Sequence, residues 1–173
     1  MKRLLFAGVL TCLCMSVLVE AATVFKWLEG AQTTLLSAQL NNFSPTGTTT
    51  ASTTYNNVVG GGQGDGATRC IFEGFFTFTA NPTPNSAVFV WLLRAPDGAN
   101  FESTPTASVT LGRLPNVRFP VTQGTTVTRV TQEVECPSGL WQAVANSQGT
   151  GQSMAASGNF IKVKPLTLQG VSQ

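Results

Sequence analysis

The chain has 173 residues, enough for one domain with a hydrophobic core, and only 10% of them are charged, for a formal net charge of +2. Because it contains no histidine, no spaced pair of carboxylates and no basic stripe, we expect no catalytic residue, no metal or cofactor site and no nucleic-acid partner. Thr, Ser, Asn, Gln and Gly fill the surface instead, which is typical of an extracellular or assembled protein.

Residues 1–21 have the features of a secretory signal peptide. Lys2 and Arg3 form a positive start, Leu4–Val19 is an apolar run, and Val19–Ala21 suits a cleavage site. A run of about 16 residues is short for a membrane anchor, so we expect no membrane segment in the mature form. Alternatively, translation begins at Met15 and this extension is not part of the protein. In both cases residues 22–173 are expected to form the folded domain.

The N-terminal part of this domain predicts short strands and polar loops. Val24–Gly30 and Thr33–Leu40 can each form a short strand, since neither has a helix cap or a sustained helical period. Asn41–Thr54 predicts a polar surface loop. The glycine-rich Gly60–Gly66 lacks the residues of a phosphate-binding, dinucleotide-binding or calcium-binding loop, so we interpret it as a flexible connector.

Two alternating segments carry the cysteines of the domain. Arg69–Ala80 places Cys70 on the same face as phenylalanines, and Thr125–Cys136 places Cys136 on the same face as valines. Both cysteines should therefore point inward. They form either one disulfide, which would clip two strands across the core, or a pair of buried thiols.

The most apolar stretch is Ala87–Ala95, in which residues of both parities are large and only Arg94 is charged. This pattern predicts a central strand that is covered on both faces. Arg113–Val121 is interrupted by Pro115 and Pro120, which favours an edge strand or an extended segment. Further short strands are expected at Thr106–Leu111, Leu140–Asn146 and Asn159–Leu168. About eight strands without a convincing helix predict an all-β fold, a single β-sandwich of jelly-roll type.

Several stretches of the domain resemble small structural proteins of tailed bacteriophages. The stretches are Phe25–Ser37, Gly60–Gly66, Val90–Glu102, Phe119–Thr131, Pro137–Asn159 and Ile161–Thr167. The resemblance implies a β-rich virion component, of the capsid decoration or tail- and fibre-associated type, with no catalytic residues. Phage particle proteins assemble in the cytoplasm without a signal peptide, so the resemblance favours a start near Met15.

These observations lead to three hypotheses. The first is a non-enzymatic virion structural protein, located in the virion, which binds copies of itself or other virion proteins and forms a homo-oligomer. The second is an exported, extracellular subunit that polymerises into a filament by pairing strand edges. The third is a secreted carbohydrate-binding module, for which Trp27 is the one tryptophan expected to be exposed, since Trp91 and Trp141 fit the core. The candidate assembly contacts are Phe25, Trp27, Arg113, Pro115, Arg118 and Pro120, with the loop 41–66.

Overall fold

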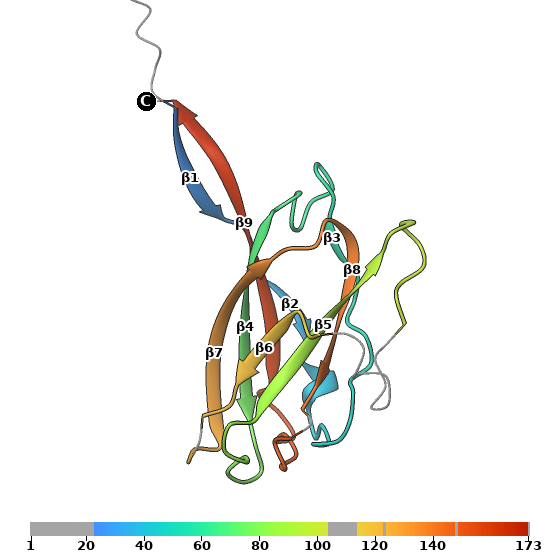
Figure 1. The fold of residues 1–173 in the computed structure, drawn as a ribbon, viewed down its shortest axis with the longest axis vertical. Helices are drawn as coiled ribbons and strands as arrows, with labels where there is room; N and C mark the ends of the chain where they lie inside the picture. Colours follow the sequence, from blue (N-terminus) through green and yellow to red (C-terminus); the bar gives the residue numbers. More distant parts are fainter. Residues whose placement is uncertain (1–22, 104–113, 123, 148, 173) are drawn as a thin grey trace, which may run out of the picture.

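A computed structural model describes residues 23–103, 114–122, 124–147 and 149–172 of the chain. These residues form two antiparallel sheets that pack against each other as a β-sandwich, which confirms the predicted all-β class (Figure 1). The strands are β1 (Thr23–Glu29), β2 (Thr33–Leu36), β3 (Tyr55–Asn57), β4 (Arg69–Thr77), β5 (Ala87–Ala95), β6 (Val117–Pro120), β7 (Val127–Glu135), β8 (Gly139–Asn146) and β9 (Phe160–Ser172). One 3-10 turn, η1 (Ala38–Leu40), follows β2.

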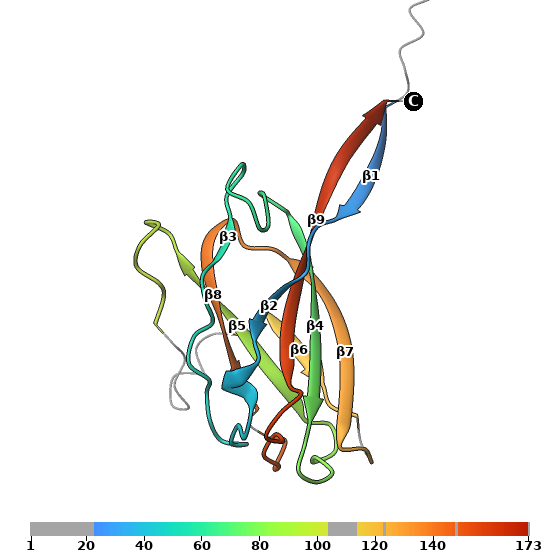
Figure 2. The same ribbon diagram turned by 180° about the vertical axis from the view of Figure 1, so that it is seen from behind.

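The sandwich consists of a five-stranded and a four-stranded sheet, and the longest strand, β9, belongs to the first. The first has the order β1-β9-β4-β7, with β2 also paired to β9, and the second has the order β3-β8-β5-β6. The 13-residue β9 pairs with β4 over Phe160–Leu166 and with β1 over Leu166–Ser172. One strand thus connects the sandwich with the part of the chain that extends beyond it (Figures 1 and 2).

The core between the sheets follows the predicted alternation. Cys70, Phe72 and Phe76 point inward from β4 and are fully buried. Trp141 of β8 packs against Phe72 and stacks on Tyr55 of β3, with the Tyr55 and Trp141 ring centroids 4.4 Å apart. Aromatic groups of this size dominate the free energy of burial in a domain core.

The prediction of a central strand at Ala87–Ala95 is confirmed. β5 lies between β8 and β6, and it contributes to buried clusters on both faces. Val88, Val90 and Leu92 face the main core, whereas Trp91 and Leu93 form a second cluster with Val144. Arg94 is exposed near the end of the strand.

The segment 41–54 is more than the polar surface loop that the composition predicts. Thr49 and Ser52 are buried, because they replace a neighbouring strand along β8. The Thr49 backbone N–H donates to the Ala145 carbonyl at 2.9 Å, and the Ala145 N–H donates to the Thr49 hydroxyl at 2.9 Å. Hydroxyl groups therefore satisfy backbone groups that a regular strand would otherwise pair.

Some expectations fall on residues outside the described part. These are the extension 1–21, the strand at Thr106–Leu111 and the candidate contact Arg113. Within the described ranges, the structure contains no helix of sufficient length and apolarity to cross a bilayer.

Candidate assembly surface

The feature that stands out from the sandwich is a two-stranded ribbon formed by β1 and the last part of β9 (Figures 1 and 2). Among the described strands, β1 pairs with β9 alone, from Thr23 opposite Ser172 to Glu29 opposite Leu166. β4 pairs with β9 only as far as Leu166. We define the ribbon as β1 together with residues 167–172 of β9, which have β1 on one side and no described strand on the other.

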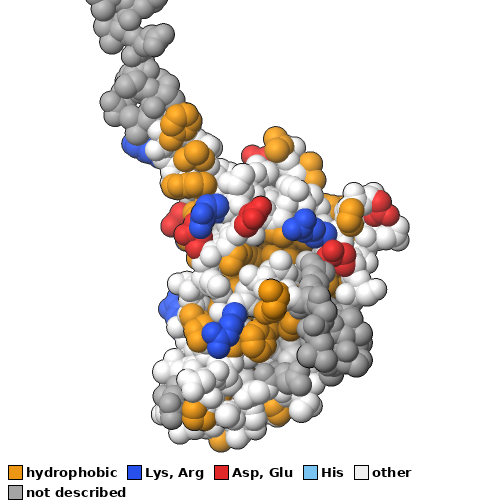
Figure 3. All heavy atoms as spheres, in the orientation of Figure 1, with side chains coloured by type: hydrophobic (Ala, Val, Ile, Leu, Met, Phe, Trp, Pro, Cys, Tyr) orange, Lys and Arg blue, Asp and Glu red, His pale blue; other side chains and the backbone are white. Residues whose placement is uncertain are grey.

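One face of the ribbon is apolar and exposed. Residues directly opposite each other in an antiparallel pair point to the same face, so Trp27 and Leu168 are neighbours and Phe25 follows on the same face. The exposed fractions of Phe25, Trp27 and Leu168 are 67%, 49% and 51%. Figure 3 shows apolar side chains gathered along this extension. The opposite face carries Lys26 and Leu28.

Both edges of the ribbon carry backbone groups that face outward. The Gly30 N–H donates to the Pro165 carbonyl at 2.8 Å, so the carbonyl of Pro165 points toward the β1 side. Backbone groups alternate in direction along a strand, and those of Leu168 and Gly170 therefore point away from β1, toward the open edge. By the same register, the backbone groups of Trp27 face the outer edge of β1. A two-stranded ribbon of this kind is only marginally stable in water.

A cleft of about 300 Å³ lies beside the open edge of β9 at the base of the ribbon. One wall is Thr167–Gln169 of β9, and the other is Asp65–Thr68, which leads from the glycine-rich loop into β4. This loop is a series of turns and not the flexible connector that its composition suggests. The Gln63 side chain accepts from the Asn56 N–H, and the Asp65 carboxylate accepts from the Gly60 N–H.

The glycines of this loop allow its tight packing. Gly64 is buried, and a Cβ atom at this position would collide with the side chains of Asn57 and Tyr55. Gly60, Gly62 and Gly66 have positive φ angles that favour glycine. The glycines of the loop therefore determine the conformation of this wall of the cleft.

The proline-bounded segment after residue 113 forms an edge strand, as predicted, but this edge is covered. β6 is the last strand of its sheet, and its Val117 and Phe119 are buried. Arg118 and Pro120 are exposed and Pro115 is half-buried. The Arg118 N–H donates at 2.9 Å to the side chain of Gln132, which reaches over from β7 of the other sheet. This bond occupies a donor that an incoming strand would need.

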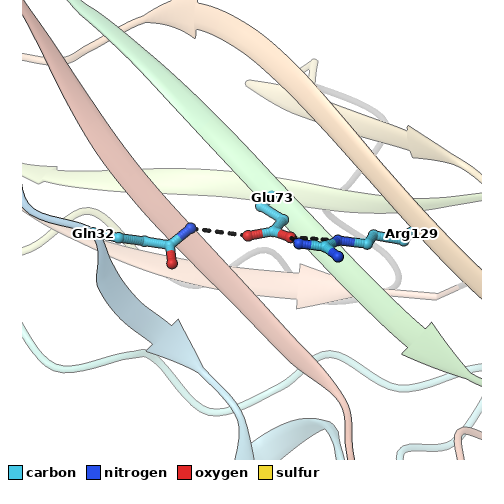
Figure 4. Close-up of polar contacts among 3 residues, drawn as sticks. All are labelled: Gln32, Glu73 and Arg129. Carbon is cyan, nitrogen blue, oxygen red and sulfur yellow. Dashed lines mark hydrogen bonds and ion pairs between the residues drawn. The ribbon is translucent and has the colours of Figure 1, made fainter. Parts of the chain in front are cut away.

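A polar cluster lies on the outer face of the five-stranded sheet (Figure 4). Glu73 is only 8% exposed, and its carboxylate accepts hydrogen bonds from Gln32 at 2.9 Å and from Arg129 at 2.7 Å. Burial alone would raise the pKa of Glu73, but these hydrogen bonds and the charges of Arg129 and Lys162 hold it below its usual value. Glu73 is thus an ionised, paired group at neutral pH.

The base of the ribbon continues this polar band. Lys164 and Glu29 form an ion pair of 2.7 Å on the same face as Trp27, and Arg69 pairs with Glu133 nearby. Alternation along β7 places Arg129 and Glu133 on the face opposite Cys136, but alternation alone does not provide the register that brings Arg129 to Glu73. Among the described residues, no group of three or more Cys, Asp or Glu side chains is arranged to hold a metal ion.

Cys70 and Cys136 are joined as a disulfide, and both are buried. β4 and β7 are neighbours in one sheet, so the bond closes one end of that sheet and does not cross the core, contrary to our expectation. The alternation had correctly predicted that both cysteines point inward.

The tryptophans lie where the sequence predicted. Trp27 is exposed on the ribbon, whereas Trp91 and Trp141 are buried. The apolar face of the ribbon was only partly anticipated: Phe25 and Trp27 were candidates, but Leu168 was not, because the predicted final strand ended at that residue and its pairing with β1 was not visible in the sequence.

Comparisons with known proteins provide no relative for this chain. No protein-family model, no curated protein and no solved structure matches it.

Proposed function

We propose that this protein is a non-enzymatic structural subunit of a tailed-bacteriophage virion, of the capsid decoration or tail-associated type. The observation that carries the assembly role is the ribbon, whose exposed apolar face and two strand edges without a described partner strand extend beyond the sandwich. The placement in a virion rests on the resemblance of six stretches of the domain to small phage structural proteins.

The mode of binding follows from the surface chemistry. An exposed strand edge offers N–H and C=O groups in register, and a partner strand can pair with them. The Thr-, Asn- and Gln-rich remainder of the surface suits neutral hydrogen bonds to a repeating lattice. Such a surface associates through shape and backbone pairing and depends little on net charge.

The test is the protein content of purified particles. Virions would be isolated on a density gradient and their proteins quantified by mass spectrometry against the major capsid protein. We expect a fixed copy number per particle that survives repeated purification. Absence from the particles, or a trace amount that washes away, would overturn the proposal.

A second candidate function, an exported filament subunit, is favoured by the Cys70–Cys136 disulfide, since such bonds persist in oxidising compartments. Intact mass of the native protein, with and without reduction, separates the two. A chain that begins at Ala22 and gains about two mass units on reduction would support export with a bridged pair. A chain that begins near Met15 would support assembly in the cytoplasm.

A further inference from the structure

We infer that the ribbons of three copies of this chain pair edge to edge and close into a six-stranded antiparallel β-barrel, with Phe25, Trp27 and Leu168 of each copy inside. The inference deepens the proposed function by naming the partner of the ribbon as further copies of the same chain, and it rests on the role in assembly.

The two open edges of the ribbon are complementary to each other. On the sandwich side of β9, β4 runs antiparallel to β9 and ends its pairing at Leu166. Beyond that residue no described strand pairs with β9 on this side, and Asp65–Thr68 lies across the cleft from it. The β1 strand of a second copy can continue along this position, antiparallel to β9. Because β1 is also antiparallel to β9 within one chain, all ribbons then point in the same direction.

The cleft beside β9 is placed to receive that strand. It borders Thr167–Gln169 on the open side, and its far wall includes the exposed residue Asp65, whose carboxylate also accepts from the Gly60 N–H. The central residue of β1 is Lys26, which is exposed on the face of the ribbon opposite Trp27. A β1 strand from a second copy therefore brings a cation to a cleft that carries an anion, which favours this chain as its own partner.

A closed ring of ribbons pairs both edges of each ribbon and covers its apolar face at the same time. A face-to-face dimer would cover the apolar face and leave all four edges open. A dimer through one edge per ribbon would leave the other edge and much of the apolar face in water. A head-to-tail pairing of β1 with β9 repeats until the rotation closes, and closure places one face of every ribbon in the interior.

Three copies form the smallest ring with an interior. Each ribbon contributes two strands, so three ribbons give six. Phe25, Trp27 and Leu168 fill the interior, and Glu29, which shares their face, lies at the sandwich end of the barrel in its ion pair with Lys164. Phe25 lies opposite Gly170, and Trp27 lies opposite Leu168, so in each pair an aromatic residue of β1 faces a smaller residue of β9. Lys26 and Leu28 lie on the outside of this barrel.

The first test is the native mass of the purified chain by light scattering and native mass spectrometry. We expect three chains. Trp27→Thr combined with Leu168→Thr should give monomers, whereas Leu28→Thr, on the same strand with a similar exposed fraction but on the opposite face, should stay trimeric. A wild-type mass other than three chains would overturn the inference, as would a trimer that tolerates the double variant and fails with Leu28→Thr.

The second test separates edge pairing from apolar contact. Gly170→Pro removes an N–H that faces the open edge without removing a side chain, and Gly170→Ala retains that N–H. We expect Gly170→Pro to dissociate the trimer and Gly170→Ala to preserve it. Equal behaviour of the two variants would contradict pairing at this edge. Near-ultraviolet circular dichroism of each variant verifies that the sandwich is folded.

The inference and the proposed function can fail separately. A chain that forms trimers through the ribbon but is absent from virions would remove only the virion placement. A chain that is present at fixed copy number in virions and monomeric in isolation would remove only the ring.

Discussion

The β6 edge of the sandwich is covered, whereas the edges of the ribbon are not paired with any described strand. The β6 edge has four residues, includes Pro120, and has the Arg118 N–H bonded to the Gln132 side chain. The ribbon has the seven-residue β1 strand and residues 167–172 of β9, and no described strand pairs with their outer edges. Open edges invite association, and proteins usually cover them. Because the molecule covers the β6 edge and not the edges of the ribbon, the ribbon is the better candidate for association with another chain.

The β6 edge and the ribbon also differ in how far their side chains are buried against the core. Val117 and Phe119 of β6 are fully buried against the core, whereas Phe25 of the ribbon is 67% exposed. The sandwich should therefore fold without a partner, and the ribbon should depend on one. Four sets of variants and conditions each test one side of this comparison, in order of the expected change in stability.

The largest effect should come from removing the disulfide. Cys70 and Cys136 are 66 residues apart, and closing a loop of this length is worth about 4 kcal/mol on the chain-entropy estimate. We expect Cys70→Ala with Cys136→Ala to lower the free energy of unfolding by about this amount in urea titrations. A loss below about 1 kcal/mol would mean that the sandwich does not rely on this closure.

Uncovering the β6 edge should have an intermediate effect. Gln132→Ala leaves the Arg118 N–H without its partner, which should cost about 1 kcal/mol. It should also increase light scattering on heating, because a second edge becomes available. Gln142→Ala is the control, since the Gln142 amide makes only a 3.4 Å contact with Thr54. Equal scattering by the two variants would show that Gln132 does not protect the edge.

A smaller effect should follow acidification through the Glu73 cluster. The pKa of Glu73 is lower in the folded protein than its ordinary value of 4.5. Its contribution to stability is therefore complete above that ordinary value and is lost as the pH falls through the lower, folded pKa. Because Arg129 is largely exposed, we expect a change below about 1 kcal/mol. Glu73→Gln should flatten the unfolding profile between neutral and acidic pH, and an unchanged profile would contradict this role.

The smallest effect on the sandwich should come from the ribbon itself. Trp27→Thr at dilutions where the chain is monomeric should change the free energy of unfolding by less than about 0.5 kcal/mol, because the side chain does not reach the core. Hydrogen exchange gives the complementary readout. Amides of residues 23–29 should be protected only at concentrations that allow assembly, and protection at every concentration would show that the ribbon is stable alone.

The sequence predicted the sandwich better than it predicted the surface. Alternation along Arg69–Ala80 and the two-sided apolar pattern of Ala87–Ala95 each report burial directly, because side-chain direction follows strand geometry. Both predictions are confirmed. β3 was not predicted, because three residues, Tyr55–Asn57, are too short to show a period.

The assembly surface depended on information that the local pattern does not contain. Phe25 and Trp27 suggested contacts, but their exposure follows from β1 pairing with residues 167–172, more than 135 positions later. The predicted strand stopped at Leu168, since Gln169-Gly170 resembles the end of a strand. Register between distant strands is set by tertiary packing, and for that reason neither the ribbon nor the Glu73–Arg129 pair could be predicted from the sequence alone.

The continuity of β9 has a mechanical consequence. This single strand is hydrogen-bonded to β1 in the ribbon and to β2 and β4 in the sandwich. A pulling force applied to the ribbon along its axis is therefore transmitted into the sheet along β9, where the ladder bonds to β4 bear it together, in shear. Rupture then requires many bonds to fail at once, whereas a force applied sideways would peel them one at a time. The direction of β9 thus sets the direction in which an attached subunit resists load.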